Sequence, residues 1–282
     1  MKICYVKWLV LVLLIVGWAT SLAAQEAELT PQASGRSHYE GCILLGQDNP
    51  QDAFDLGMRW RDQGGGLPAQ HCVALALAGL GLYEQAAEQL DLVANNLRTG
   101  KGLNFAQMVS RGDRKVLADI YLQSGNAWLL ANRPIMAYDA FSQGLLETDI
   151  VSQQALELYI DRARASGLSG DYQPALNDLG KASEIAPERV DIFVYIATAH
   201  RALENFDAAT QALESALTNF PDNPDALLER GNLRFAMGDI DAARLDWVRL
   251  ISIHPDNYVS DVARTNIEKL DALEDEVIAT PQ

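Results

Sequence analysis

Histidine and cysteine are the side chains that most often hold metal ions or act as nucleophiles. This chain has four histidines and three cysteines. His38, His71, His200 and His254 stand far apart, with no HExxH, HxH or paired CxxC pattern. His71 precedes Cys72, but neighbours on a helix point about 100° apart, so the pair is poorly placed for a thiol nucleophile and its base. The sequence therefore predicts no metal site and no catalytic cysteine.

Phosphate-binding and acyl-transfer motifs are also missing. Gly100-Lys101 fails the Walker pattern, because Asn95 stands where a glycine is required and Gly102 where serine or threonine is required. Residues 64–66 are glycines that follow an expected helix, whereas a dinucleotide-binding loop follows a strand. We predict no catalytic activity and no cofactor. The alternative is an enzyme whose site is too dispersed to show as a motif.

The segment 1–24 has the order of features found in a signal peptide. Lys2 and Lys7 precede an uninterrupted apolar run over residues 8–18, and small residues follow it. The run is shorter than the roughly 20 apolar residues that a membrane-spanning helix needs. We expect residues 1–24 to be removed and the protein to be exported, to the periplasm in a double-membrane bacterium. An uncleaved membrane anchor is the alternative.

The mature chain is expected to be strongly acidic. Loss of Lys2 and Lys7 leaves 20 of the 22 basic residues against 38 acidic ones, a net charge near −18. Such a surface repels nucleic-acid phosphates and anionic lipid headgroups, and no basic run supplies a footprint for them. We expect no nucleic acid partner and no stable membrane insertion after cleavage.

Two cysteines remain after cleavage, Cys42 and Cys72. In an oxidising compartment an even number of cysteines indicates disulfide bonding. Both cysteines lie near the N-terminus, where the end of a chain of repeats needs stabilisation. We predict a disulfide between them. The alternative is a pair of buried thiols that pack as small apolar side chains.

A 34-residue period organises the second half of the chain, with Pro187, Pro221 and Pro255 in register and full copies at 156–189, 190–223 and 224–257. In each copy, large apolar residues stand three or four positions from small ones, which predicts two amphipathic helices that approach closely. The small residues at positions 8 and 20 are Ala163, Ala197, Gly231, Ala175, Ala209 and Ala243. Glycine, asparagine or aspartate between the halves favours a turn, and the proline ends the second helix.

This pattern resembles the tetratricopeptide repeat (TPR), whose positions 4, 7, 8, 11, 20, 24, 27 and 32 prefer Trp, Leu, Gly, Tyr, Ala, Phe, Ala and Pro. The chain departs from it at position 7, where Arg162 and Arg230 replace leucine, and at position 11, with Ser166, His200 and Arg234. We expect these departures to loosen local packing. The resemblance implies an all-α superhelix, a TPR-like solenoid of about five helix hairpins with capping helices.

Weaker copies at 67–100 and 118–151 extend the expected repeat domain over residues 67–257. Residues 25–66 are expected to form an N-terminal helical cap, split at Asp48-Asn49-Pro50. Residues 101–117 interrupt the period and predict a loop with an extension of the next helix. Residues 258–282 are expected to form a capping helix from Val259 to Leu273 and a frayed tail.

In the TPR family the first helix of each repeat lines a concave groove, largely through positions 2, 5, 9, 12 and 13. Carried onto this chain, the resemblance implies a groove between residues 119 and 236. The partner-binding residues that we select there are Asn126, Arg164, Arg201, Leu228, Asn232 and Phe235. We expect the arginines to hold acidic groups of a ligand and Leu228 and Phe235 to supply apolar contacts. Alternatively, the arginines only pair with nearby Glu157 or Asp191.

The resemblance also implies what the protein does. TPR solenoids bind other proteins, so we expect an exported adaptor or scaffold that holds a partner protein or an extended peptide. One TPR subclass grips the C-terminal carboxylates of chaperones with a lysine at position 5, which is apolar in the last four copies, so that clamp is not expected. A chaperone-like role in envelope assembly is the alternative.

Overall fold

The computed structural model describes residues 31–102 and 114–279, with side chains over 38–102 and 114–272. The described residues form α-helices joined by short turns, and no strand occurs among them. The expected signal peptide, and most of the segment that interrupts the period, lie outside the described residues. Within the described ranges, no helix combines the length and the apolar character needed to cross a membrane.

In the described part of the chain, five helix hairpins follow an N-terminal pair and precede a terminal helix, as the expected fold class requires. The N-terminal pair is α1 (Pro31–Asp48) and α2 (Pro50–Asp62). The hairpins are α3 (Gly66–Gly79) with α4 (Tyr83–Thr99), α5 (Arg114–Leu130) with α6 (Pro134–Leu146), α7 (Gln153–Leu168) with α8 (Tyr172–Ile185), α9 (Val190–Ala202) with α10 (Phe206–Asn219), and α11 (Pro224–Ala236) with α12 (Ile240–Ile253). The last helix is α13 (Tyr258–Ala279). The chain is thus an all-α, TPR-like solenoid.

Small residues bring the two helices of a hairpin together, as the repeat pattern predicts. Gly125 on α5 lies against the ring of Phe141 on α6, and a Cβ atom at this glycine would overlap that ring. Gly231 on α11 stands in the same relation to Trp247 on α12. The facing apolar side chains of the two helices are thereby buried between them.

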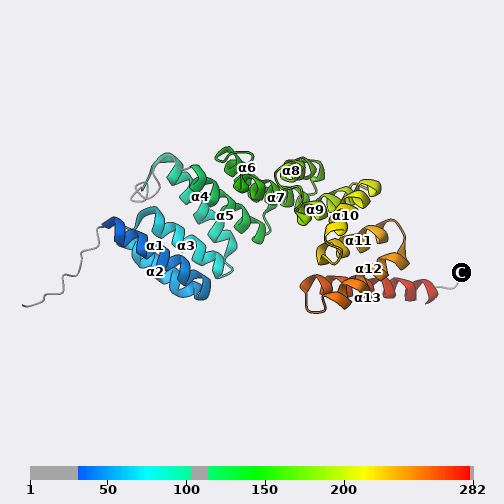
Figure 1. Ribbon diagram of the computed structural model, residues 1–282. Coiled ribbons are helices and arrows are strands. Elements are labelled where there is room, and N and C mark those ends of the chain that lie inside the picture. The colour runs from blue at the N-terminus through cyan, green and yellow to red at the C-terminus, as the bar shows by residue number, and fades with distance from the viewer. Residues whose placement is uncertain (1–30, 103–113, 280–282) are drawn as a thin grey trace, which may run out of the picture.

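The hairpins stack into a curved row that runs from α1 to α13, with the two described ends at opposite ends of the arc (Figure 1). Consecutive first helices pack on one another from α5 through α7, α9 and α11 to α13. Consecutive second helices make no packing contact of comparable extent within the described ranges. First helices therefore lie on the tighter, concave side, and second helices on the convex side.

The expectation that Arg162 and Arg230 loosen the packing is wrong. The Arg162 guanidinium on α7 donates two hydrogen bonds of 2.7 Å to the buried carboxylate of Asp178 on α8. Arg230 on α11 pairs in the same way with Asp246 on α12, at 2.9 Å and 2.5 Å. Each arginine thus joins the two helices of its hairpin by a pair of charge-assisted bonds.

The terminal helix is longer than expected. The backbone of α13 stays helical to Ala279, whereas the sequence predicts a helix that ends at Leu273 and a frayed tail. The helix packs on α11 and α12 and buries Val259, Ala263 and Leu270. The exposed end of the solenoid is therefore covered by a helix that has no second helix after it within the described residues.

Candidate functional site

The concave face is the candidate site, and acidic residues of the first helices organise its middle part. Asp161 on α7 accepts a hydrogen bond of 3.1 Å from Asn126 on α5 and one of 2.7 Å from Arg164, one turn along α7. Burial alone would lower the pKa of the Arg164 guanidinium, but the bond to Asp161 raises it. Two of the predicted partner-binding residues therefore already share one carboxylate of the protein.

A second carboxylate holds the next predicted residues. The Arg201 guanidinium on α9 donates to both oxygens of the buried Glu229 on α11, at 2.6 Å and 3.2 Å. The Asn232 amide lies 3.5 Å from the same carboxylate, and its oxygen accepts a bond of 3.0 Å from Asn266 on α13. These contacts fasten consecutive first helices side by side, so Arg201 and Asn232 hold the solenoid together on its inner face.

The remaining two predicted partner-binding residues, Leu228 and Phe235, both lie on α11. Leu228 is half-buried and packs against the apolar cluster between α11, α12 and α13. The side chain of Phe235 is 41% exposed, and its ring lies 6.0 Å from the ring of Trp247. Phe235 therefore offers more free apolar surface to a partner than Leu228 does.

The alternative that the two groove arginines pair with Glu157 or Asp191 is wrong. Both carboxylates are taken by Arg189, which lies just before α9 and reaches Glu157 at 2.5 Å and Asp191 at 2.9 Å. These bonds, first the one to Glu157, raise the pKa of the Arg189 guanidinium. Arg164 and Arg201 are paired with the residues at position 6 of the repeats instead.

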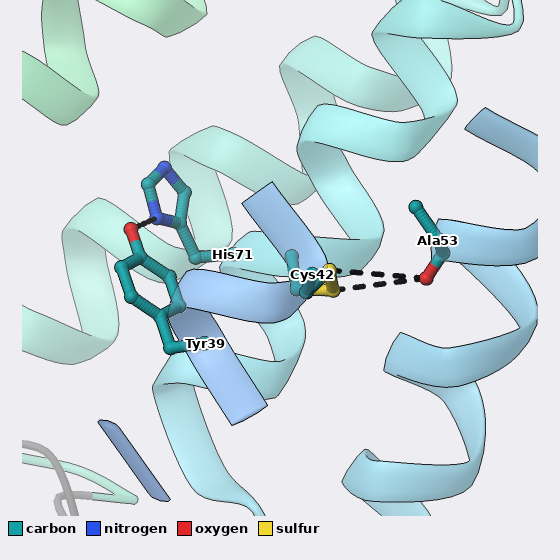
Figure 2. The surroundings of a disulfide bond; sticks show 5 residues. Tyr39, Cys42, Ala53 and His71 are labelled. Atoms are coloured by element: carbon teal, nitrogen blue, oxygen red, sulfur yellow. Dashed lines mark hydrogen bonds between the residues drawn. A yellow bond between two sulfur atoms is a disulfide. The ribbon is translucent and has the colours of Figure 1, made fainter. Parts of the chain in front are cut away.

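Cys42 on α1 and Cys72 on α3 form a disulfide, with their Cα atoms 6.1 Å apart, which agrees with the predicted pairing. Figure 2 shows the bond beside the carbonyl oxygen of Ala53 on α2, which lies 3.8 Å and 3.7 Å from the two sulfur atoms. Both cysteines are buried. The bond therefore ties the N-terminal pair of helices to the first hairpin.

His71 forms a second tie in the same region. Its Nδ1 atom lies 2.7 Å from the hydroxyl of Tyr39 on α1, and its Nε2 atom lies 2.6 Å from the carbonyl oxygen of the Gln123 side chain on α5 (Figure 2 shows the first contact). Because the Gln123 oxygen can only accept, Nε2 carries the proton and Nδ1 accepts from Tyr39. A neutral imidazole thus satisfies both neighbours at once.

Stability is expected to fall when the solution is acidified through the range in which histidine titrates. Burial lowers the pKa of His71 below its usual value, and it also raises the pKa of Tyr39 to about 12. Below about pH 6.5 His71 binds a proton in the unfolded chain but stays neutral in the folded chain. The free energy of unfolding therefore decreases as the pH falls.

Urea titrations between about pH 7 and pH 5 should show this decrease, and His71→Gln should flatten it. An equal slope in both proteins would assign the pH dependence to other groups.

No group of three or more histidine, cysteine, aspartate or glutamate side chains within the described ranges is placed to hold a metal ion. The Cys72 sulfur is engaged in the disulfide, so it offers no thiolate to the neighbouring His71. Among the described residues the concave face is therefore organised by ion pairs, amide hydrogen bonds and exposed apolar side chains.

A family model described as "Tetratricopeptide repeat" matches residues 196–258, which span α9 to the start of α13. No protein of curated function matches the chain in sequence. The match covers most of the last two of the three full copies, 190–223 and 224–257.

Several solved structures have the same fold. PilW, described as a widely conserved type IV pilus biogenesis factor, has a TM-score of 0.60 and 15% identity, over 81% of this chain and 97% of its own. PilF from Pseudomonas aeruginosa has a TM-score of 0.55 and 13% identity, over 83% and 99%. MamA from Desulfovibrio magneticus RS-1 has a TM-score of 0.53 and 14% identity, over 68% and 97%. At these identities the likeness concerns the fold alone.

Proposed function

We propose that this protein is an exported interaction scaffold, which holds a partner protein or an extended peptide along the concave face formed by α5, α7, α9 and α11. The observation that carries the proposal is the continuous inner face of these first helices, which pack on one another over four successive repeats. On such a surface, equivalent side-chain positions recur once per repeat. An extended segment can therefore contact successive repeats along its length.

The polar groups of the face refine how a partner would be held. Arg201 and Asn232 are committed to Glu229, so we assign them to fastening the helices. Arg164 donates to Asp161 through Nη1 only, and within the described part of the chain its other N–H groups have no partner. These N–H groups can bind carbonyl oxygens of an extended segment, while Phe235 supplies apolar contact.

Export is part of the proposal, and the sequence features of residues 1–24 together with the disulfide support it. Intact-mass measurement of protein recovered from the export compartment should find a chain cut after Ala23 or Ala24. Recovery of a chain that still begins at Met1, in the membrane fraction, would contradict cleavage and support a retained anchor.

A chaperone-like role in envelope assembly is the second candidate. The similarity of fold to PilW, a type IV pilus biogenesis factor, supports this candidate. This candidate uses the same concave face but predicts a transient client, so the bound fraction should fall once assembly is complete. A stable scaffold stays bound to its partner.

Photo-crosslinking tests the face directly. A crosslinking amino acid in place of Phe235 should yield a discrete adduct in the native compartment, and mass spectrometry identifies the partner. The matched control is the same amino acid in place of Leu245, which is 69% exposed on α12 of the convex side. Adducts from position 245 with none from position 235 would refute the concave face as the binding surface.

A further inference from the structure

A cavity of about 390 Å³ opens where the α7/α8 turn meets α9. Leu168, Leu179, Tyr172 and Tyr195 supply most of its apolar wall, and Arg164 lies at its polar side. Leu168 is 64% exposed at the rim. Ligand pockets measure about 300–1,000 Å³, so this cavity suits one or two large side chains of a bound segment.

The cavity lies where the repeat at 156–189 has a glycine, Gly167, and the next repeat has an arginine, Arg201. Gly167 stands one full repeat before Arg201, and Tyr195 stands one full repeat before Glu229. One repeat further along, the Arg201 and Glu229 side chains meet at 2.6 Å and join α9 to α11. At Gly167 no side chain reaches across, and the corresponding position remains open.

No feature of the backbone accounts for Gly167. It is the second-to-last residue of α7, its φ is not positive, and an added Cβ atom would have no other atom within 4 Å. Alanine would favour the helical backbone at this position more than glycine does. The visible consequence of this glycine is therefore the open cavity.

The surroundings of the cavity are acidic. Burial raises the pKa of Tyr195. Arg164 opposes this rise, and Asp191, Asp161 and Asp225 contribute to it. Asp225, at the start of α11, has no cation partner within the described ranges, and partial desolvation raises its pKa, with a further contribution from Asp191. Asp161 and Asp191 are paired with Arg164 and Arg189, so among the described residues a ligand that enters here meets an apolar wall and one uncompensated carboxylate, that of Asp225.

We infer that this cavity anchors an extended segment of the partner protein through a large apolar side chain with a lysine or arginine beside it. The inference deepens the proposed function and rests on it. The apolar side chain fills the space left by Gly167, and the neighbouring cation lies towards Asp225, whereas Asp191 is already paired with Arg189. Charge complementarity selects a basic segment, because an acidic one would add to the carboxylates already present.

A library of short random peptides, displayed on phage and selected on the immobilised mature protein, provides the probe. Enriched sequences should place Trp, Phe or Leu next to Lys or Arg. Gly167→Leu should weaken binding of the best enriched peptide by at least about tenfold, because the new side chain enters the cavity. Gly180→Leu is the matched control: this glycine on α8 is also surrounded by open space but does not line the cavity, and binding should stay within about twofold.

A second variant does not depend on filling the cavity. Asp225→Asn removes an exposed charge and should weaken binding of the same peptide, more at low salt than at high salt. Circular dichroism and the thermal midpoint confirm that each variant is folded.

Three outcomes overturn the inference: enrichment of acidic peptides, no enrichment at all, or equal binding by wild type and Gly167→Leu. If adducts still form at position 235, the scaffold proposal survives such a failure. If those adducts are absent, the scaffold proposal fails independently of the peptides.

Discussion

Asp178→Ala is expected to lower the free energy of unfolding by about 3–5 kcal/mol, because it leaves a buried arginine without its counter-charge. The side chains of Arg162 and Asp178 are only 15% and 4% exposed. The guanidinium also donates to Ser142 at 3.1 Å and lies 5.3 Å from the centre of the Tyr138 ring. Because Ser142 and Tyr138 lie on α6, the arginine cannot turn to water without breaking the packing of α7 against α6.

The control for this prediction comes from the next repeat. Ile196 and Ala212 stand one full repeat after Arg162 and Asp178, so the same two positions are apolar there. The double variant Arg162→Ile/Asp178→Ala should therefore recover most of the loss and unfold within about 1–2 kcal/mol of wild type.

Urea denaturation followed by circular dichroism measures both variants. A double variant as unstable as Asp178→Ala would show that the pair itself is required. A loss below about 1 kcal/mol in the single variant would show that water reaches Arg162.

The hairpins could be predicted because the repeat period fixes which positions face each other. Gly125 and Gly231 can be assigned to close helix contacts from the sequence alone, since large aromatic residues stand at the facing position of the second helix. The end of α13 could not be predicted in the same way. Its last residues follow no repeat, so no register marks where the helix stops.

The charged pairs needed information that the repeat register alone does not contain. The family pattern prefers leucine at position 7, so by that pattern alone Arg162 is expected to weaken the packing. The sequence did contain one indication of these ion pairs, because the charged residues recur two full repeats apart. The recurring residues are Arg162 and Arg230, Asp178 and Asp246, and Asp161 and Glu229. A charge pattern that recurs in alternate repeats indicates pairing between the positions concerned.

The partners of the groove arginines differ in how far they could be foreseen. Asp161 lies three residues before Arg164 on one helix, a spacing at which side chains meet, so this pair was accessible from the sequence. Glu229 lies 28 residues after Arg201 on another helix. That contact depends on how α9 and α11 are inclined to each other, which only the assembled solenoid determines.

Loss of the Cys42–Cys72 disulfide is the second large effect that we expect. Replacing both cysteines with alanine should lower the free energy of unfolding by about 3–4 kcal/mol in the chain-entropy model, because the bond closes a loop of 30 residues. The loop holds α1 and α2 against α3, which packs with both of them. The first effect should be the opening of this N-terminal end, where Tyr39 then loses its contact with His71.

Reductant provides the matched comparison for this prediction. It should lower the urea midpoint of wild type towards that of Cys42→Ala/Cys72→Ala and leave the variant unchanged, since the one other cysteine of the sequence, Cys4, lies in the expected signal peptide. Thiol labelling of the unreduced, denatured protein should detect no free thiol. Two reactive thiols per chain would instead support the alternative of buried, unbonded cysteines, and the N-terminal end would then depend on packing and on the His71 contacts alone.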